Sequence, residues 1–300
     1  MRRVLLAIIF SLVFSYTTCL NADAGIISNK KAAFEKNRIE KNYKKEITTL
    51  FNLQDRYAKK YDLKSIKSLY SPQFMDNDGY NKDVYFSLVK DTWETYPDIT
   101  YDTKIKKITI NGDYATVETE ESAVATTDDV DRAIVGELHS KSRCRYHLQR
   151  FSNKWEITGE EVFDEFSTLK YGEARYIDMK LESPKIVGAG QDYTSTLKVE
   201  LPKNIIAIAS INREKIVNPP EKPEESFKRL SENNSLARIF TANTDNINEY
   251  NVAAIGMTTA TGGDDGKIHI YMNGLAFIMT RVNVVPKNNF AKVGEESDEQ

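Results

Sequence analysis

The sequence predicts an α+β protein in which helices pack on an antiparallel sheet, followed by a mostly β, sandwich-like domain with a helical insertion. Three observations predict this class. Between Ile47 and Tyr96, apolar residues recur at the spacing of amphipathic helices. From Ile99 the apolar period changes to two, as in strands with one buried face. After about Ala174, short alternating segments recur between turn residues, which favours a second domain rich in strands.

Residues 1–24 have the pattern of a secretory signal peptide. Arg2 and Arg3 form its positive end, and the apolar run from Val4 to Phe14 is too short to cross a membrane as a mature helix. The sequence Ala22-Asp23-Ala24 matches the small-residue cleavage motif, so we expect cleavage after Ala24. We therefore expect a secreted or periplasmic protein with no membrane span in the mature chain.

Charge and cysteine content exclude several classes of protein. The chain carries 41 Lys and Arg against 44 Asp and Glu, a net charge of −3, and loss of residues 1–24 removes two arginines and one aspartate to give −4. Such a chain has no strong attraction for nucleic acid or anionic lipid. Cleavage also removes Cys19, which leaves Cys144 without a disulfide partner. Lipidation of Cys19 is the alternative, although Tyr16 and Thr18 fit a lipobox poorly.

A charged helical lead-in, residues 25–45, precedes the first domain, residues 46–171. The first helix of this domain has one stripe of residues facing a core, formed by Ile47, Leu50, Phe51, Gln54, Tyr57, Ala58 and Tyr61. Gln54 is the polar exception on this stripe. It must find a hydrogen-bond partner or border a wet cavity.

A short helix capped by Asp62 is expected to end at Ser71-Pro72, because proline cannot continue the helical hydrogen bonds. Phe74 to Asp78 then predicts a short strand in which Asp76 and Asp78 share one face. Two close acids raise the pKa of one of them, which suits a proton-transferring base. The alternative is that both cap the turn at Gly79.

Asn81 is a plausible cap for a further helix, which ends before Pro97. Its apolar stripe is rich in aromatic residues and consists of Tyr85, Leu88, Val89, Trp93 and Tyr96. One interpretation is that this stripe packs on the sheet as core. The other is that Trp93 and the tyrosines wall an apolar ligand pocket.

Strands follow from Ile99, with the hairpin signal Asn111-Gly112 between the first two of them. A long strand, bent or bulged, is expected over Ile134 to Phe151. One of its faces is basic, with Lys141, Arg143, Arg145 and His147, and it alternates with an apolar face. By this alternation His147 points to solvent or to a partner. The basic face suits an anionic ligand or an acidic partner surface.

The first domain resembles the nuclear transport factor 2-like superfamily, which includes ketosteroid isomerases and polyketide cyclases. The matching residues lie within about residues 45 to 165 and are Asp62, Leu63, Ile66, Leu69, Tyr70, Phe74, Asp78 and Gly79. The resemblance implies a cone of helices on a curved antiparallel sheet. It places Asp78 at the isomerases' general base, Gln54 at their oxyanion-binding tyrosine with Tyr57 one turn away, and His147 near their second oxyanion donor. Of these three positions only Asp78 carries the family's residue type, and His147 would here point into the cavity.

The second domain is expected over residues 172–287, with six strands and a helical insertion from Glu224 to Phe240 after Pro223. Residues 288–300 form an acidic tail that cannot bury enough apolar surface to order itself. Three histidines without ligand spacing and one mature cysteine give no metal site, and no cofactor motif appears.

Without a complete catalytic set, the sequence predicts an exported, non-catalytic binding or interaction protein. Its partner would be a small apolar ligand in the cone, or a second copy or another protein on the sheet face. The first alternative is an isomerase or dehydratase with Asp78 as general base. The second is a structural component of an envelope complex. The candidate pocket residues are Gln54, Tyr57, Asp76, Asp78, Trp93 and His147.

Overall fold

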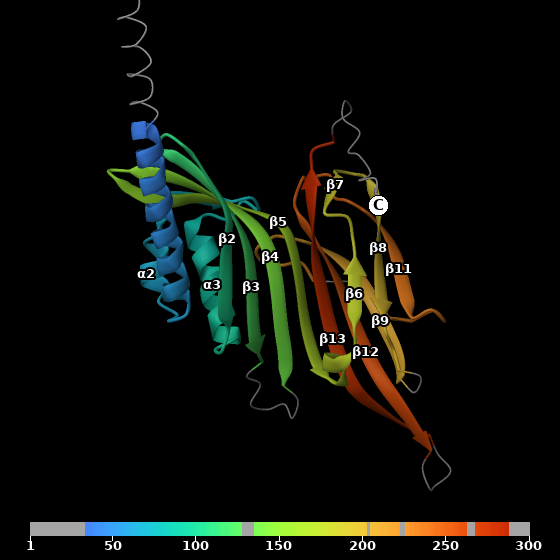
Figure 1. The fold of residues 1–300 in the computed structure, drawn as a ribbon. Helices are drawn as coiled ribbons and strands as arrows, with labels where there is room; N and C mark the ends of the chain where they lie inside the picture. Colours follow the sequence, from blue (N-terminus) through green and yellow to red (C-terminus); the bar gives the residue numbers. More distant parts are fainter. Residues whose placement is uncertain (1–33, 128–134, 203–204, 223–225, 263–267, 288–300) are drawn as a thin grey trace, which may run out of the picture. The chain divides into compact units, whose positions relative to one another are not determined.

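The computed structural model describes residues 34–127, 135–202, 205–222, 226–262 and 268–287 (Figure 1). The predicted signal peptide and acidic tail therefore lie outside the described residues. The chain divides into two compact units, Met1–Phe51 and Asn52–Gln300. In the first unit, residues 34–51 are helical. None of the helices in the described ranges is both long and apolar enough to cross a membrane.

The second unit begins with helical residues 52–58, and everything below concerns this unit. The helix α2, Leu63–Lys67, is capped by Asp62, whose Oδ1 accepts from the Ser65 amide at 3.0 Å. The strand β1, Tyr70–Asp76, follows. The helix α3, Lys82–Thr95, has the predicted cap, since Asn81 Oδ1 accepts from two backbone amides of its first turn.

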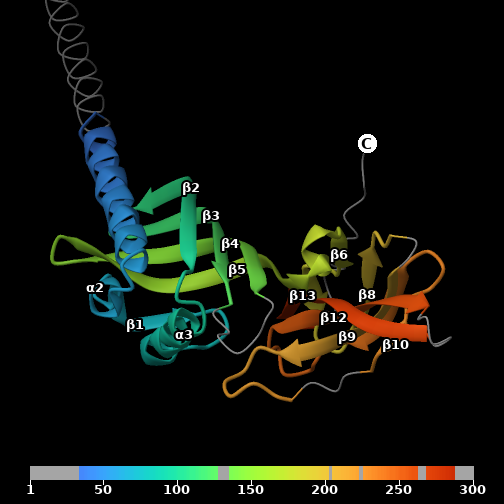
Figure 2. The same cartoon turned by 90° about the horizontal axis from the view of Figure 1, so that it is seen from below.

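Four long antiparallel strands form the first part of the sheet: β2 (Thr100–Asn111), β3 (Tyr114–Thr126), β4 (Gly136–Phe151) and β5 (Lys154–Gly172). The predicted hairpin joins β2 to β3, where Gly112 has φ +62°, a conformation that favours glycine. The helix α3 covers one face of these strands (Figures 1 and 2). The strand β1 pairs with β5 in parallel.

Two bulges interrupt the pairing of β4 with β5, and both extra residues, Thr158 and Phe163, belong to β5. The alternation along β4 is therefore unbroken. Cys144, Tyr146 and Leu148 are buried. His147 lies on the opposite face with 40% of its side chain exposed.

The remaining elements are η1 (Glu173–Tyr176), β6 (Met179–Glu182), β7 (Ile186–Gly188), β8 (Asp192–Val199), β9 (Ile205–Lys215), β10 (Lys228–Arg229), β11 (Ser235–Thr241), β12 (Glu249–Gly262) and β13 (Ile268–Val285). A ten-stranded sheet has the order β10-β9-β12-β13-β5-β4-β3-β2, with β1 and β7 beside this path. A second sheet has the order β11-β8-β6. The two sheets share an apolar core that includes Leu181, Leu197, Ile211, Ile255 and Ile278, which gives a sandwich-like packing.

The helical insertion expected over Glu224–Phe240 is wrong for the described residues, which form β10 and β11. Every residue of β11 pairs with β8, from Ser235 opposite Lys198 to Thr241 opposite Asp192. Asn234, just before β11, has φ +55°, which is the left-handed region. A continuous right-handed helix does not contain residues in that region. Cross-strand pairing therefore overrides the local helix signal.

The large sheet continues across Tyr171-Gly172, where the sequence places a domain boundary. Residues 166–172 of β5 pair with residues 274–280 of β13. β5 therefore carries β4 on one side and β13 on the other. The domain limits 46–171 and 172–287 stay predictions.

Candidate functional site

A cavity of about 120 Å³, here called the aromatic cavity, lies between α3 and the sheet. Its lining includes Gln54, Ile66, Tyr70, Tyr85, Phe86, Val89, Trp93, Tyr101, Glu121 and Tyr146. Gln54 Nε2 donates to the Tyr70 hydroxyl at 3.1 Å, while Gln54 Oε1 is buried without a partner among the described residues. Gln54, the polar residue on the apolar stripe of the first helix, thus borders a cavity. Only one of its two side-chain polar atoms has a hydrogen-bond partner among the described residues.

The aromatic residues of this cavity also pack on one another. The Tyr70 ring centroid lies 5.0 Å from that of Phe74 and 4.9 Å from that of Phe86, both in edge-on contacts. Trp93 is 9% exposed and donates from Nε1 to the Tyr101 hydroxyl at 3.1 Å. Trp93 is therefore both core and cavity wall.

Two carboxyl groups lie beside the tyrosines: Glu160, which is buried, and Glu121, which is half-buried. Glu121 Oε1 accepts from Thr119 Oγ1 at 2.8 Å and from the Tyr146 hydroxyl at 2.9 Å. Glu160 is 7% exposed and is hydrogen-bonded by Tyr85 and Tyr146. Its Oε2 has no hydrogen-bond partner among the described residues.

Burial, and after it the negative charge of Glu121, raise the pKa of Glu160 to about 8, while the hydrogen bond from Tyr85 opposes this shift. Burial also raises the pKa of Glu121, while its hydrogen bonds from Thr119 and Tyr146 oppose the shift. Glu160 consequently keeps its proton to a higher pH than an exposed glutamate does. A neutral carboxyl of this kind can donate a hydrogen bond or exchange a proton.

A larger cavity of about 550 Å³, here called the acidic cavity, adjoins the aromatic one and shares Tyr85, Val89 and Tyr101 with it. Its wall combines tyrosines with an excess of acidic over basic residues. The acids are Asp76, Asp78, Glu160, Glu165 and Glu214, and the bases are Lys215 and Arg281. Residues from α3, β5, β12, β13 and the segment after β9 meet here.

Asp78 lies in this wall as half of a buried ion pair. Its Oδ2 accepts from Arg281 Nη1 at 2.9 Å, and its Oδ1 accepts from Arg281 Nη2 and, at 2.8 Å, from Asn248 Nδ2. The side chains of Arg281 and Asp78 are 1% and 8% exposed. Both carboxylate oxygens are therefore engaged by hydrogen-bond donors, which leaves Asp78 poorly placed to accept a proton.

Asp76 and Asp78 do not project together from one strand, because β1 ends at Asp76. Asp76 Oδ1 accepts from the amides of Asp78 at 3.0 Å and Tyr80 at 2.8 Å, and Gly79 follows the turn with φ +85°. Burial raises the pKa of Asp76. Of the pair, Asp76 caps the turn and Asp78 binds Arg281.

Tyr57 and His147 line neither cavity. The Tyr57 ring lies 5.4 Å from the Arg56 guanidinium carbon. His147 Nε2 lies 2.8 Å from Glu161 Oε1 on the outer face of the sheet, so it cannot stabilise charge inside the cone.

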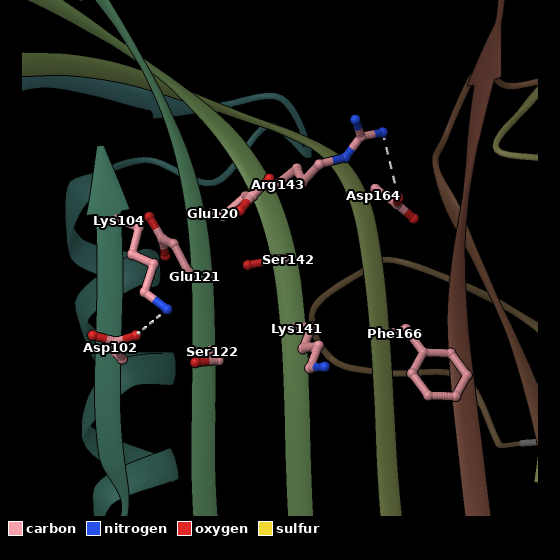
Figure 3. Close-up of a pocket in the computed structure, with 10 residues that line it drawn as sticks. All are labelled: Asp102, Lys104, Glu120, Glu121, Ser122, Lys141, Ser142, Arg143, Asp164 and Phe166. Atoms are coloured by element: carbon pink, nitrogen blue, oxygen red, sulfur yellow. Dashed lines mark ion pairs between the residues drawn. The ribbon is translucent and has the colours of Figure 1, made fainter. Parts of the chain in front are cut away.

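The outer face of the sheet carries an open groove of about 350 Å³ (Figure 3). Within it, Lys104 Nζ lies 3.2 Å from Asp102 and Arg143 Nη2 lies 3.4 Å from Asp164. Arg145 similarly contacts Glu118 and Glu161 of the neighbouring strands. Arg143, Arg145 and His147 of β4 thus lie against acids, and the expected basic surface is a mixed one.

Sequence reasoning missed Glu121 and Glu160. Glu121 had a signal, because it shares its strand face with Val117, Thr119 and Ala123 and is the one acid among them. Glu160 had no such signal. Strict alternation from the inward-facing Ile157 would place Glu160 on the outer face, but the bulge at Thr158 shifts the alternation by one residue and turns Glu160 inward.

Part of this structure is similar to solved structures of the nuclear transport factor 2-like superfamily, which the sequence resembles. A superfamily protein from Salmonella enterica serovar Typhimurium is 20% identical, covering 41% of this chain and 91% of that chain with a TM-score of 0.36. A hexachlorocyclohexane dehydrochlorinase from Novosphingobium barchaimii is 10% identical, covering 41% and 86% with a TM-score of 0.36. A Bdellovibrio bacteriovorus protein is 14% identical, with 39% of each chain covered and a TM-score of 0.33. No protein-family model and no curated protein matches the chain.

Proposed function

We propose that this is an exported, non-catalytic protein that binds a small molecule in the acidic cavity and the adjoining aromatic cavity. One observation carries the proposal. Glu160 lines the acidic cavity, and its buried Oε2 has no hydrogen-bond partner among the described residues. A buried polar atom without a partner is costly, and a ligand that supplies the missing partner recovers that cost.

The dimensions of the acidic cavity support this proposal. Its volume of about 550 Å³ lies within the range of about 300–1,000 Å³ that small-molecule sites occupy. Tyr85, Val89 and Tyr101 provide apolar surface. A few charged groups beside them provide orientation, which is the usual composition of such sites.

Export is supported by the composition of residues 1–24 alone. Expression of the full chain in its source cell, followed by mass analysis of the isolated protein, tests it. We expect the mature chain to begin at Gly25. An intact Met1, or a lipid on Cys19, would contradict this expectation.

Binding is tested with three probes of matched shape: phenethylamine, 2-phenylethanol and phenylacetate, titrated into the mature protein by calorimetry. Leu88 is 37% exposed and lines the acidic cavity, so Leu88→Trp fills the cavity without disturbing the core. Ser87→Trp, on an exposed neighbouring position outside both linings, is the matched control. We expect Leu88→Trp to weaken every probe that binds and Ser87→Trp to weaken none. Failure of all three probes to bind would overturn the proposal.

A second candidate is an isomerase or dehydratase in which Glu160, rather than Asp78, moves the proton. Its support is the pKa of about 8, which places Glu160 near the pH at which a general acid or base works best. The test is deuterium exchange at the carbon between the ring and the carbonyl of phenylacetone in D₂O. Exchange that the protein accelerates and Glu160→Gln abolishes would favour this candidate. Exchange at the rate of buffer alone excludes it for this probe.

A further inference from the structure

We propose that the ligand of the acidic cavity is an organic cation, an alkylammonium or arylalkylammonium group whose charge lies beside Glu160 and whose apolar body lies against the tyrosine rings. This inference rests on the proposed function. It adds the chemical class of the ligand.

The charges of the cavity wall favour a cation. Five carboxyl groups face two basic side chains, and both bases are already paired. Arg281 binds Asp78, and Lys215 Nζ lies 3.1 Å from Asp245 Oδ2. An anion entering this wall finds only basic side chains that already bind an acid, whereas a cation finds carboxyl groups beside it.

The tyrosines favour an organic cation over a metal ion. Tyr85, Tyr101 and Tyr250 line the same cavity, and ring faces attract ammonium groups. The described residues contain no group of three or more His, Cys, Asp or Glu placed to hold a metal ion. The acids are therefore spread around an aromatic space instead of converging on one point.

Glu160 supplies the missing hydrogen-bond acceptor. Its Oε2 is buried and without a partner among the described residues. An ammonium N–H would donate to it, forming a charge-assisted hydrogen bond when Glu160 is ionised. The apolar body of the ligand would then extend along Tyr85 and Val89 toward the aromatic cavity.

Binding of a cation then depends on pH in a defined direction. The titratable groups around Glu160 are Tyr70 and Asp76 of β1, Tyr85 of α3, Glu121 of β3, and Cys144 and Tyr146 of β4. Burial raises the pKa of all three tyrosines and of the thiol, so these groups stay neutral. Burial also raises the pKa of Glu121, which, like Glu160, gains negative charge as the pH rises. A cation favours ionised Glu160, so its affinity rises with pH up to about 8. A neutral ligand that accepts a hydrogen bond from protonated Glu160 would show the opposite trend.

The experiment compares the three probes in calorimetric titrations of the mature protein. At about pH 7.5 we expect phenethylamine to bind at least about tenfold more tightly than 2-phenylethanol, and phenylacetate to bind most weakly. From about pH 6 to about pH 8 the affinity for phenethylamine should rise, because Glu160 ionises over this range while the alkylammonium keeps its proton. The affinity for 2-phenylethanol should not rise.

Two variants locate the effect. Glu160→Gln should remove the preference for phenethylamine over 2-phenylethanol and abolish its pH dependence. Glu161→Gln changes the adjacent acid, which contacts Arg145 and His147 on the outer face, and should leave both unchanged. The pH profile of the wild-type protein tests the inference independently should Glu160→Gln fail to fold.

The outcomes separate the inference from the proposed function. If 2-phenylethanol or phenylacetate binds as tightly as phenethylamine, or if the affinity for phenethylamine falls with pH, the cavity binds ligands but the cation inference is overturned. If none of the three probes binds, both are overturned. Binding of phenethylamine that Leu88→Trp does not weaken would also overturn the inference, because the cation would then occupy another place.

Discussion

At the scale of single residues, the surroundings decide the ionisation of each buried acid. Glu160 and Glu121 lie among tyrosine hydroxyls and have raised pKa values, whereas Asp78 lies against a guanidinium. Glu160 and Asp78 line the same cavity, yet Glu160 has a raised pKa and Asp78 is hydrogen-bonded by an arginine. Residue type alone therefore gives no guide to which acid can exchange a proton.

The raised pKa of Glu160 predicts how stability depends on pH. The folded state holds the proton up to about pH 8, and the unfolded chain releases it near the ordinary glutamate pKa of 4.5. The free energy of unfolding thus falls as pH rises between these values, by on the order of 4 kcal/mol in total. Glu160→Gln should flatten this decline, as urea unfolding at about pH 5 and about pH 8 would measure. Parallel pH profiles for wild type and variant would contradict the assignment.

The buried ion pair predicts a cost that an exposed pair does not have. Asp78→Asn leaves the Arg281 charge buried at 1% exposure and should lower the free energy of unfolding by about 3–5 kcal/mol. Asp102→Asn, which breaks the exposed pair with Lys104, should cost less than about 1 kcal/mol. Urea unfolding compares the two. Adding Arg281→Met to Asp78→Asn should restore part of the loss, because the uncompensated charge is then gone.

At the scale of elements, signals confined to a few neighbouring residues were predictable. The cap at Asn81 and the hairpin at Asn111-Gly112 depend on side chains within a turn of their target, and both were expected from the sequence. The identity of β11 depends on pairing with β8, some forty residues away, which overrides the local helix pattern. The bulge at Thr158 likewise depends on the partner strand, so the inward orientation of Glu160 could not be predicted from alternation along the sequence.

The end of β5 predicts a sharp contrast between two glycines with positive φ. An added Cβ at Gly172, with φ +59°, would meet the Asn273 carbonyl oxygen at 2.3 Å, whereas one at Gly112, with φ +62°, would meet nothing within 4 Å. Gly112→Ala should therefore cost about 1 kcal/mol of backbone strain. Gly172→Ala should cost clearly more, because the β5–β13 pairing must shift. Thermal unfolding of both variants measures the difference, and equal midpoints would contradict it.

At the scale of the whole second unit, the shared sheet predicts cooperative unfolding. Residues 166–172 of β5 pair with β13, and Asp78 binds Arg281 across 203 positions of sequence. Contacts of this kind join the segments that the sequence assigns to two domains. We expect one calorimetric transition for the mature protein, with equal calorimetric and van't Hoff enthalpies. Two separate transitions, unaffected in spacing by Asp78→Asn, would show independent domains instead.

A partner on the sheet face stays a prediction, in the form of a second copy or an envelope protein. The outer groove is open, but its charges are largely satisfied within the chain, as the Arg143–Asp164 and Lys104–Asp102 pairs illustrate (Figure 3). Sedimentation of the mature protein tests self-association. A dimer that Arg143→Glu dissociates would support the sheet face as its interface.

The pairing of β13 with β5 also sets the order in which contacts can form while the chain is being synthesised. Until residues 274–285 have been added, residues 166–172 of β5 lack their β13 partner and Asp78 lacks Arg281. The contacts of longest range therefore become available only after residue 281 has been synthesised.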